Sequence, residues 1–218
     1  MKKIVIVGSG GFAREVLTLI NDINKDKPQY EILGFVGLDK SLTIHGYPVI
    51  GNDEEVNSTN EPLSLVIAVG EPQMKARIRS KYSNSLISFP TLIHPSVLIG
   101  DSQSVSFGEG CVACAGCMLT TDIQINDFVT LNLMCTIGHD TVIEAYSSFM
   151  PSVNISGEVY IHEGVYVGTG AKIINHLEIG KNTIVGAGAV VAKSLPANCT
   201  AVGVPAKPIK FDCETVED

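Results

Sequence analysis

The segment LNLMCTIGHDTVIEAYSSFMPSVNISGEVYIHEGVYVGTGAKIINHLEIGKNTIVGAGAVV (131–191) has an apolar residue at every sixth position. The series begins earlier, and its members are Phe107, Ala113, Leu119, Ile125, Leu131, Ile137, Ile143, Phe149, Ile155, Ile161, Val167, Ile173, Ile179, Val185 and Val191. Since 45% of the chain is hydrophobic, so long an unbroken apolar series at one spacing is not a chance event. The period of six therefore decides the fold of this half of the chain.

A six-residue period is typical of a parallel β-helix, in which each repeat forms one flat side and one corner. Three sides make a coil, so the series predicts about five coils. Ile93 and Ile99 follow the same pattern two residues out of register. They predict roughly one further coil and a two-residue insertion within 100–106. A β-sandwich is the alternative, but its turns would not recur every six residues.

Residues 1–90 follow a different pattern, in which short apolar runs alternate with helical periodicity. Strands are expected at 4–7, 31–36 and 63–69, and helices at 12–20 and 73–82. Alternating strands and helices indicate a parallel sheet with helices on its faces. We therefore predict an α/β domain over residues 1–90 and a β-helix with a C-terminal tail over residues 91–218.

The composition excludes several classes of protein. The formal net charge of −8 argues against nucleic-acid binding, because affinity for phosphates comes mainly from Lys and Arg. No apolar run approaches the ~20 residues of a membrane-spanning helix. The apolar start of the chain is too short for the core of a signal peptide. These features predict a soluble cytoplasmic protein in which the six cysteines are free thiols.

The repeats IGKNTI (179–184) and VGAGAV (185–190), with the tail AVGVPAK (201–207), resemble the bacterial hexapeptide-repeat acyltransferases. The resemblance implies a left-handed winding of the β-helix. It also implies a homotrimer that binds acetyl-CoA in grooves between neighbouring helices. Acetyl-CoA is then the expected cosubstrate.

The N-terminal half narrows this resemblance. The segments GSGGFAREV (8–16), GFVG (34–37), AVGEP (68–72) and IHPS (93–96) resemble the sugar acetyltransferases of the sialic acid O-acetyltransferase and bacillosamine N-acetyltransferase group. The resemblance implies that the Rossmann-like α/β domain holds the sugar substrate, often as its nucleotide. It also implies a role in bacterial surface-glycan synthesis.

Glycines follow the first predicted strand and precede the first predicted helix. Bare backbone can approach a ligand there, and a helix N-terminus favours an anion; a purely structural turn is the alternative. The turn is not a full G-x-G-x-x-G, and no acidic residue ends the second strand as NAD would require. The resemblance extends the candidate set, and the predicted substrate-binding residues are Gly8, Gly10, Gly11, Phe12, Asp39 and Gly70. In that group of sugar acetyltransferases, adjacent acidic residues commonly follow the second strand. This chain has a single carboxylate there, Asp39.

His139 is the predicted general base. Ile137 and Thr141 occupy inward positions, so His139 points out of the coil at a corner, next to Asp140. The segment LNLMCTIGHDTVI (131–143) resembles the catalytic stretch of the family. The resemblance implies that His139 accepts the proton of the acceptor and that Asn132 supports it. Asp140 is placed to orient the imidazole or to stabilise its charged form.

The other histidines are weaker candidates. His45 lies in a predicted loop, and His94 lies where the repeats begin. His162 and His176 face outward, with no acidic neighbour in a supporting pattern.

Gly157 follows His139 by eighteen residues, which is three repeats, so it is expected at the same corner one coil later. The resemblance implies that its N–H binds the thioester carbonyl, and a simple corner glycine is the alternative. Gly168, Gly186 and Ala187 are further candidates for contact with acetyl-CoA, since small residues on the downstream coils let a pantetheine arm lie close. The alternative is that such corner glycines serve only the turn. Lys207 is a candidate partner for the phosphates of CoA, or a solvated surface lysine.

The spacing Cys111-x-x-Cys114-x-x-Cys117 suggests a metal or iron–sulfur site. Cys111 and Cys117, however, fall in the small inward position of the repeat, where cysteine acts as a small hydrophobe. We therefore predict no metal, although Cys114 does not fit that position.

Together these features predict an acetyl-CoA-dependent sugar N- or O-acetyltransferase. Direct transfer is expected, because no cysteine adjoins His139. The alternatives are a non-catalytic β-helix scaffold or sugar-binding protein, and a nucleotide-dependent oxidoreductase. The presence of His139, Asn132 and Gly157 argues against the scaffold, and the absence of a ribose-binding acid argues against the oxidoreductase.

Overall fold

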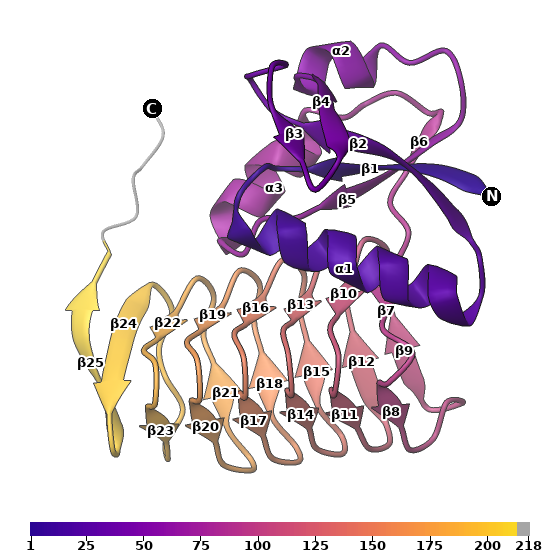
Figure 1. Cartoon of the computed structure of the whole chain (residues 1–218). Coiled ribbons are helices and arrows are strands. Elements are labelled where there is room, and N and C mark those ends of the chain that lie inside the picture. The colour runs from indigo at the N-terminus through magenta and orange to yellow at the C-terminus, as the bar shows by residue number, and fades with distance from the viewer. Residues whose placement is uncertain (213–218) are drawn as a thin grey trace. The chain divides into compact units, whose positions relative to one another are not determined.

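The chain divides into two compact units, Met1–Pro95 and Ser96–Asp218, and the computed structural model describes residues 1–212 (Figure 1). The first unit is an α/β domain and the second is a parallel β-solenoid of hexapeptide repeats, as predicted. Within the described residues, no helix is both long and apolar enough to cross a membrane.

The first unit is built on a six-stranded sheet. Its elements are β1 (Lys2–Val7), α1 (Gly11–Asp26), β2 (Tyr30–Val36), β3 (Thr43–Ile44), β4 (Tyr47–Gly51), α2 (Asp53–Asn57), β5 (Leu63–Ile67), α3 (Pro72–Ser80) and β6 (Ile87–Ser88), and the short β7 (Leu92–Ile93) follows. The strand order is β3-β4-β2-β1-β5-β6, with β1 parallel to both β2 and β5. The β3–β4 hairpin is antiparallel. The predicted strand at 63–69 is shorter than expected and ends at Ile67.

The carboxyl ends of β1, β2 and β5 meet at one edge of this sheet. The strand order reverses at β1, since β2 lies on one side of it and β5 on the other. Ligands of open α/β sheets bind in the crevice outside the carboxyl ends at such a reversal. Helix α1 begins at the same edge and is fixed there by a buried apolar face formed by Ala13, Val16, Leu17, Leu19, Ile20 and Ile23.

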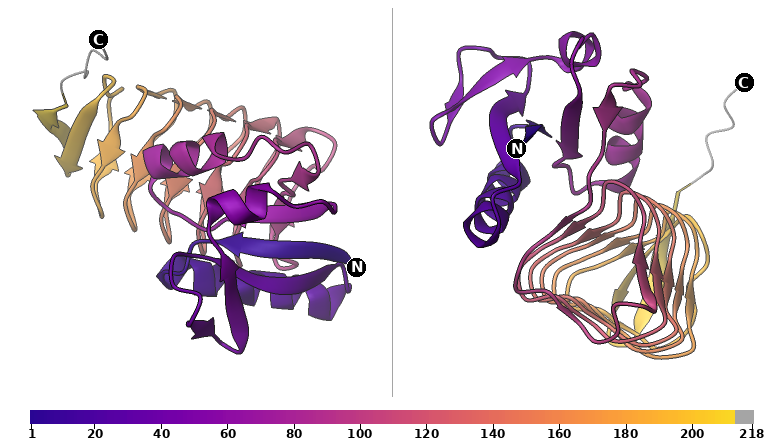
Figure 2. Two further views of the ribbon diagram at one scale, coloured as in Figure 1. Left: turned by 90° about the horizontal axis from the view of Figure 1, so that it is seen from above. Right: turned by 90° about the vertical axis from the view of Figure 1, so that its right-hand side faces the viewer.

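The strands of the second unit stack into three faces. The first face holds β10 (Val112–Ala113), β13 (Thr130–Leu131), β16 (Ser148–Phe149), β19 (Tyr166–Val167), β22 (Ile184–Val185) and β24 (Cys199–Gly203). The second holds β8 (Leu98–Ile99), β11 (Met118–Leu119), β14 (Thr136–Ile137), β17 (Asn154–Ile155), β20 (Lys172–Ile173) and β23 (Val190–Val191). The third holds β9 (Val105–Phe107), β12 (Ile123–Ile125), β15 (Val142–Ile143), β18 (Tyr160–Ile161) and β21 (Glu178–Ile179). Strand β25 (Ala206–Phe211) closes the stack as the antiparallel partner of β24. The right-hand view in Figure 2 looks along the stack, where the coils nearly superimpose.

The register confirms the predicted period. Ile137 pairs with Ile155, eighteen residues later, which is one coil of three repeats. Ile99 pairs instead with Leu119, twenty residues later, and the two extra residues lie in the turn around Asp101, as predicted. The β-sandwich alternative is wrong, because the coils pair strand on strand in parallel.

The apolar series forms the core of the solenoid. Every member from Ala113 to Val191 is buried. Phe107 is only half-buried, because β9 lies at the end of the third face and has a neighbouring strand on one side only. Cys111, Cys117 and Cys135 are buried as predicted.

One residue in each corner adopts the left-handed conformation. These residues recur every six positions as Gly110, Gly116, Asp122, Phe128, Met134, Asp140, Tyr146, Ser152, Glu158, Gly164, Gly170, His176, Asn182 and Gly188. Left-handed backbone is unusual for residues other than glycine. The stack fixes these corners through hydrogen bonds between coils, such as the one from Asp140 N–H to Thr121 C=O (3.3 Å).

Candidate active site

His139 and Asp140 form an ion-pairing couple at the corner between β14 and β15. Imidazole Nδ1 of His139 lies 2.7 Å from Asp140 Oδ2. Both side chains are more than half exposed, at 55% and 58%. The left-handed backbone of Asp140 (φ 56°) places it at the turn of the corner, beside the imidazole. With its Nδ1 face directed at a carboxylate, the ring has Nε2 left for a proton acceptor role.

Gly157 lies directly beneath the imidazole, as the spacing predicts. A Cβ at Gly157 would come within 2.5 Å of both Cε1 and Nε2 of His139, so only glycine leaves room for the ring. The backbone is tied at the same place, because Glu158 N–H donates to His139 C=O (2.7 Å). Gly157 N–H donates no hydrogen bond to any of the described residues. This N–H therefore stays available beside the imidazole.

Asn132 lies apart from His139 within the chain. Its side chain is buried, and Oδ1 accepts a hydrogen bond from Leu133 N–H (2.7 Å). It occupies the corner that follows β13, whereas His139 occupies the corner that follows β14. Over residues 1–212 no hydrogen bond joins the two side chains. The supporting role of Asn132 stays a prediction.

The expectation that His162 lacks acidic neighbours is wrong. Its Nε2 lies 2.5 Å from Glu178 Oε1, and its Nδ1 lies 3.4 Å from Glu144 Oε2. The contact with Glu178, with a further contribution from Glu144, raises the pKa of His162 against the opposing effect of burial. The hydroxyl of Tyr160 donates to Glu144 (2.7 Å), and this hydrogen bond lowers the pKa of that carboxyl.

The same expectation is wrong for His176. Its Nδ1 lies 2.9 Å from Glu158 Oε2, on the coil before it. The three acidic partners of His162 and His176 are sixteen to eighteen residues from their histidine in sequence, so no local motif reveals them.

The residues predicted to contact acetyl-CoA lie on the later coils. A Cβ at Gly168 would come 2.6 Å from Ala187 N, so this glycine is required for the close approach of two corners. A Cβ at Gly186 would come 2.7 Å from Val202 Cγ1. Ala187 is exposed, and Lys207 is exposed on β25, where it pairs with Val202.

Three loops converge where the substrate is predicted to bind in the first unit. A Cβ at Gly8 (φ 115°) would come 3.2 Å from Ala68 C=O, so the loop after β1 touches the loop after β5. Gly10 caps α1 without a side-chain hydrogen bond, and Gly11 and Phe12 begin the helix. Gly70 lies in the loop that leads into α3.

Asp39 lies in the loop that follows β2, at the same edge of the sheet. Its Oδ1 accepts hydrogen bonds from Ser41 N–H (2.9 Å) and from the Ser41 hydroxyl (2.6 Å). These bonds hold the pKa of the Asp39 carboxyl below its usual range. Next to it, Leu38 is 96% exposed and lines a cavity of about 570 Å³ together with Asn52, Asp53, Glu54, Asn57 and Lys81. No sequence pattern predicts this cavity, because its residues come from three separate loops and α2.

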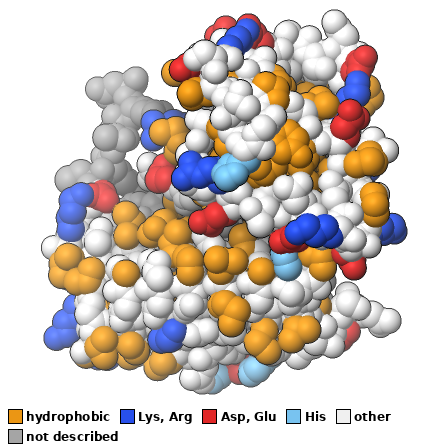
Figure 3. All heavy atoms as spheres, in the orientation of Figure 1, with side chains coloured by type: hydrophobic (Ala, Val, Ile, Leu, Met, Phe, Trp, Pro, Cys, Tyr) orange, Lys and Arg blue, Asp and Glu red, His pale blue; other side chains and the backbone are white. Residues whose placement is uncertain are grey.

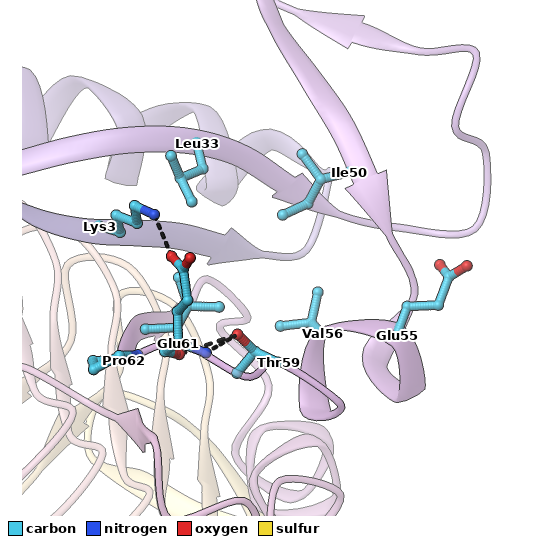
Figure 4. A pocket seen from close by; sticks show the side chains of 9 residues that line it. Lys3, Leu33, Ile50, Glu55, Val56, Thr59, Glu61 and Pro62 are labelled. Carbon is cyan, nitrogen blue, oxygen red and sulfur yellow. Dashed lines mark hydrogen bonds and ion pairs between the residues drawn. The ribbon is translucent and has the colours of Figure 1, made fainter.

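A second cavity, of about 270 Å³, lies against the same sheet (Figure 4). Its lining includes Leu33, Ile50 and Val56, and the ion pair between Lys3 and Glu61 lies at its edge (Figure 4). Lys3 donates to Glu61, Glu61 N–H donates to the Thr59 hydroxyl oxygen, and Glu55 accepts from Lys40, which does not line the cavity. None of the predicted substrate-binding residues lines it.

The cysteine cluster is part of the core. Cys111, Cys114, Cys117, Cys135 and Cys199 are buried free thiols, and Cys213 lies outside the described residues. Cys114, which does not fit the inward position of the repeat, is buried as well. In residues 1–212 there is no group of His, Cys, Asp and Glu side chains arranged to hold a metal ion.

Family models match both units. Residues 3–82 match the PglD N-terminal domain, and residues 158–193 match the bacterial transferase hexapeptide (six repeats).

Two enzymes of known function are similar to this chain in sequence. The GDP-perosamine N-acetyltransferase of Escherichia coli O157:H7 is 26% identical over 94% of this chain and 95% of its own length. The serine acetyltransferase of Buchnera aphidicola is 30% identical over 63% of this chain, but this match spans only 44% of that enzyme.

Two solved structures superpose on nearly the whole chain. A histidine-to-asparagine variant of perosamine N-acetyltransferase from Caulobacter crescentus, in complex with CoA and GDP-perosamine, superposes with a TM-score of 0.87 at 30% identity, covering 97% of this chain and 98% of that one. The acetyltransferase domain of PglB from Neisseria gonorrhoeae, in complex with acetyl coenzyme A, gives a TM-score of 0.87 at 30% identity over 95% and 99% of the two chains.

The matches cover both units in the same order, and they include the α/β sheet edge and the corner that carries His139. The chain therefore belongs to the PglD-type hexapeptide acetyltransferases, the family of sugar N-acetyltransferases that includes the perosamine enzyme and the acetyltransferase domain of PglB.

Proposed function

We propose that this protein transfers the acetyl group of acetyl-CoA to the amine of a nucleotide-linked amino sugar. The observation that carries the proposal is the His139–Asp140 couple resting on Gly157. Support comes from the full-length match to an N-acetyltransferase in complex with CoA and GDP-perosamine. The structure of its histidine variant fits a histidine-dependent reaction in that enzyme. N-acetylation is favoured over O-acetylation because the full-length matches whose reaction is named, the two perosamine enzymes, are N-acetyltransferases.

In the proposed mechanism His139 removes a proton from the sugar amine as the amine nitrogen attacks the thioester carbonyl. The tetrahedral intermediate then collapses, the C–S bond breaks, and CoA leaves as the thiol with the proton that the imidazolium returns. An unperturbed imidazole titrates near pH 6.5, so it can accept a proton at working pH, and general bases typically contribute 10² to 10⁴ in rate. Asp140 holds the ring through Nδ1 and stabilises the imidazolium that forms. The free N–H of Gly157 lies beside the ring, where it can donate to the developing oxyanion.

Acetyl-CoA supplies the activated acyl group. The later coils fit an extended thioester arm, because Gly170 and Gly188 have no neighbouring atom within 4 Å of where a Cβ would lie, and Ala187, next to Gly188 in the same corner, is small and exposed. Lys207 would face the phosphates of CoA from β25.

The acceptor would bind at the carboxyl edge of the first unit. The glycine turn after Gly8, whose own N–H donates to Val36 C=O, and the start of α1 offer backbone N–H groups to a diphosphate. Asp39, Gly70 and Phe12 lie on the loops and helix turn that meet there.

The experiment is an acetyltransferase assay that detects free CoA thiol. The acceptors are UDP-, dTDP- and GDP-linked amino sugars, with free sialic acids as the O-acetylation arm. Turnover of one nucleotide amino sugar, with an amide in the product by mass spectrometry, is expected. Absence of thiol release with every amino sugar, or turnover with sialic acid alone, would contradict the proposal.

We also propose that the protein works as a cytoplasmic homotrimer. His139 is more than half exposed on a single chain, so a reaction that needs exclusion of water requires a further protein surface beside it. A neighbouring copy packed against the flat faces of the solenoid would supply it.

A further inference from the structure

The corner that carries His139 is one level in a column of charged residues. Asp122, Asp140, Glu158 and His176 follow one another at intervals of eighteen residues, and each has left-handed backbone (φ 55° to 58°). The register of β14 with β17 and of β17 with β20 stacks these corners on successive coils. Neighbouring parallel strands are about 4.8 Å apart, so adjacent members of the column are close neighbours.

Three carboxylates in such a column repel one another, and the structure shows how each is engaged. Asp122 accepts a hydrogen bond from the Thr121 hydroxyl (2.9 Å). Asp140 contacts His139, and Glu158 contacts His176 at 2.9 Å. The carboxylate of Glu158 is therefore turned along the stack, away from the coil that carries His139.

Glu158 is nonetheless tied to the catalytic corner by its backbone. Its N–H donates to His139 C=O (2.7 Å), and His176 N–H donates to Gly157 C=O (3.2 Å). The two pairs, His139 with Asp140 and Glu158 with His176, thus span three successive coils that share hydrogen bonds. Without His176, the carboxylate of Glu158 has no ion-pairing partner among the described residues and is free to swing toward the imidazole of His139.

We propose that His176 is a positioning residue that keeps Glu158 away from His139, so that Asp140 remains the one carboxylate acting on the base. The proposal rests on the proposed function, because it concerns the same imidazole. A second carboxylate near His139 would favour the protonated ring, and a protonated ring cannot accept the proton of the amine. The base would then become active only at higher pH.

The charged groups around the column are few. Asp122 and Asp140 stand on the coils before Glu158. Lys193 stacks on Asn175, the neighbour of His176, and so lies at the same corner one coil later. The Glu158–His176 pair is exposed, so the effect is small: unit charges about 5 Å apart in water change a titration midpoint by roughly half a pH unit. The change should shrink as salt is added, because exposed charges are screened.

The test compares His176→Gln, Glu158→Gln and the double variant with the unmodified protein. His162→Gln is the matched control, since it also removes a histidine paired with carboxylates but at a different corner. The first readout is the NMR titration of the His139 ring, which needs no substrate. The second is the ascending limb of the pH profile of kcat/KM.

His176→Gln should move the His139 midpoint and the ascending limb upward by about half a pH unit, which lowers kcat/KM about threefold on the acid side of the profile. Glu158→Gln in the same chain should restore both, and His162→Gln should leave both in place. An unchanged midpoint in His176→Gln, or a shift that persists in the double variant, would overturn the proposal. If the NMR shift is seen but no acceptor is acetylated, the proposed function fails and the electrostatic role of His176 stands.

Discussion

His139 combines three properties that a corner histidine rarely has together: exposure, a carboxylate on Nδ1 and a glycine beneath the ring. Because its side chain lies outside the core, His139→Ala should leave the fold intact and lower kcat by at least two orders of magnitude. KM for acetyl-CoA should change little. Steady-state kinetics with circular dichroism as the fold control checks this, and near-normal turnover would end the mechanism.

Asp140→Asn provides a graded comparison at the same corner. It keeps the side-chain shape but removes the charge that stabilises the imidazolium, so its loss in kcat should be smaller than that of His139→Ala. An equal or larger loss would show that Asp140 does more than orient the ring.

Gly157→Ala tests the close approach beneath the imidazole. The new Cβ would lie within 2.5 Å of ring atoms, so either the ring or the coil must move. We expect a fall of about tenfold or more in kcat, because misplacement of a catalytic group by an ångström is costly. Gly46→Ala is the control for adding a methyl group away from the site: Gly46 lies in the turn between β3 and β4, nothing lies within 4 Å of its Cβ position, and its left-handed backbone (φ 86°) carries a modest strain. Equal activity in Gly157→Ala and the unmodified enzyme would contradict the assigned role.

At the scale of elements, His162 links three successive coils. It follows β18 and contacts Glu144, which follows β15, and Glu178, which begins β21. Its imidazole lies between Glu144 and Glu178, and its ring packs against Tyr160 with centroids 4.8 Å apart. The pKa of His162 is raised in the folded protein. The contacts of the charged His162 ring with the two carboxylates therefore stabilise the fold fully below the unfolded pKa of about 6.5. This contribution is lost as pH rises through the higher pKa of the folded protein.

The expected result is a thermal unfolding midpoint that is lower in His162→Gln than in the unmodified protein near pH 6, with the difference closing at alkaline pH. Thermal melts across pH 5.5 to 9 measure it. A difference that is the same at every pH would show that His162 acts through packing and not through its charge.

The buried cysteines of the solenoid, such as Cys117 directly before β11, behave as core residues. Cys117→Ala should retain activity and cost about 1 kcal/mol of stability, because it removes a buried sulfur from a packed coil. Chemical denaturation gives the stability and elemental analysis gives the metal content. Stoichiometric zinc or iron in the purified protein would overturn the reading of this cluster.

At the scale of the whole molecule, the solenoid exposes a number of large apolar side chains. They are Leu98, Met118, Leu133, Met134, Tyr160, Ile174, Ile184, Val202, Val204, Ile209 and Phe211. Figure 3 shows apolar side chains gathered over the coils on the face that it presents. Such surfaces are typical of sites that contact another protein.

The proposed trimer follows from these surfaces and from the open corner at His139. Light scattering should give a mass near three times 23.2 kDa at micromolar concentration. A monomer at that concentration would contradict both the trimer and a site shared between copies.

The sequence by itself determined the architecture of both units, because each rests on a periodicity. An inward position every sixth residue leaves one arrangement that buries all of them, and the spacing of eighteen brings Gly157 under the corner of His139. The alternation of strand and helix likewise predicted the parallel sheet, whose carboxyl edge carries the loops that hold Gly8, Asp39 and Gly70.

Only the tertiary structure decided which side chains act on one another across coils. The carboxylates that pair with His162 and His176 come from other coils, and Asn132 turns its amide to its own backbone instead of toward His139. A hexapeptide period fixes where each Cα stands in the stack, but a side chain at a corner can point along the stack or across it. That choice depends on the backbone conformation of the corner and on the charges of the coils above and below, which become neighbours only when the chain has wound.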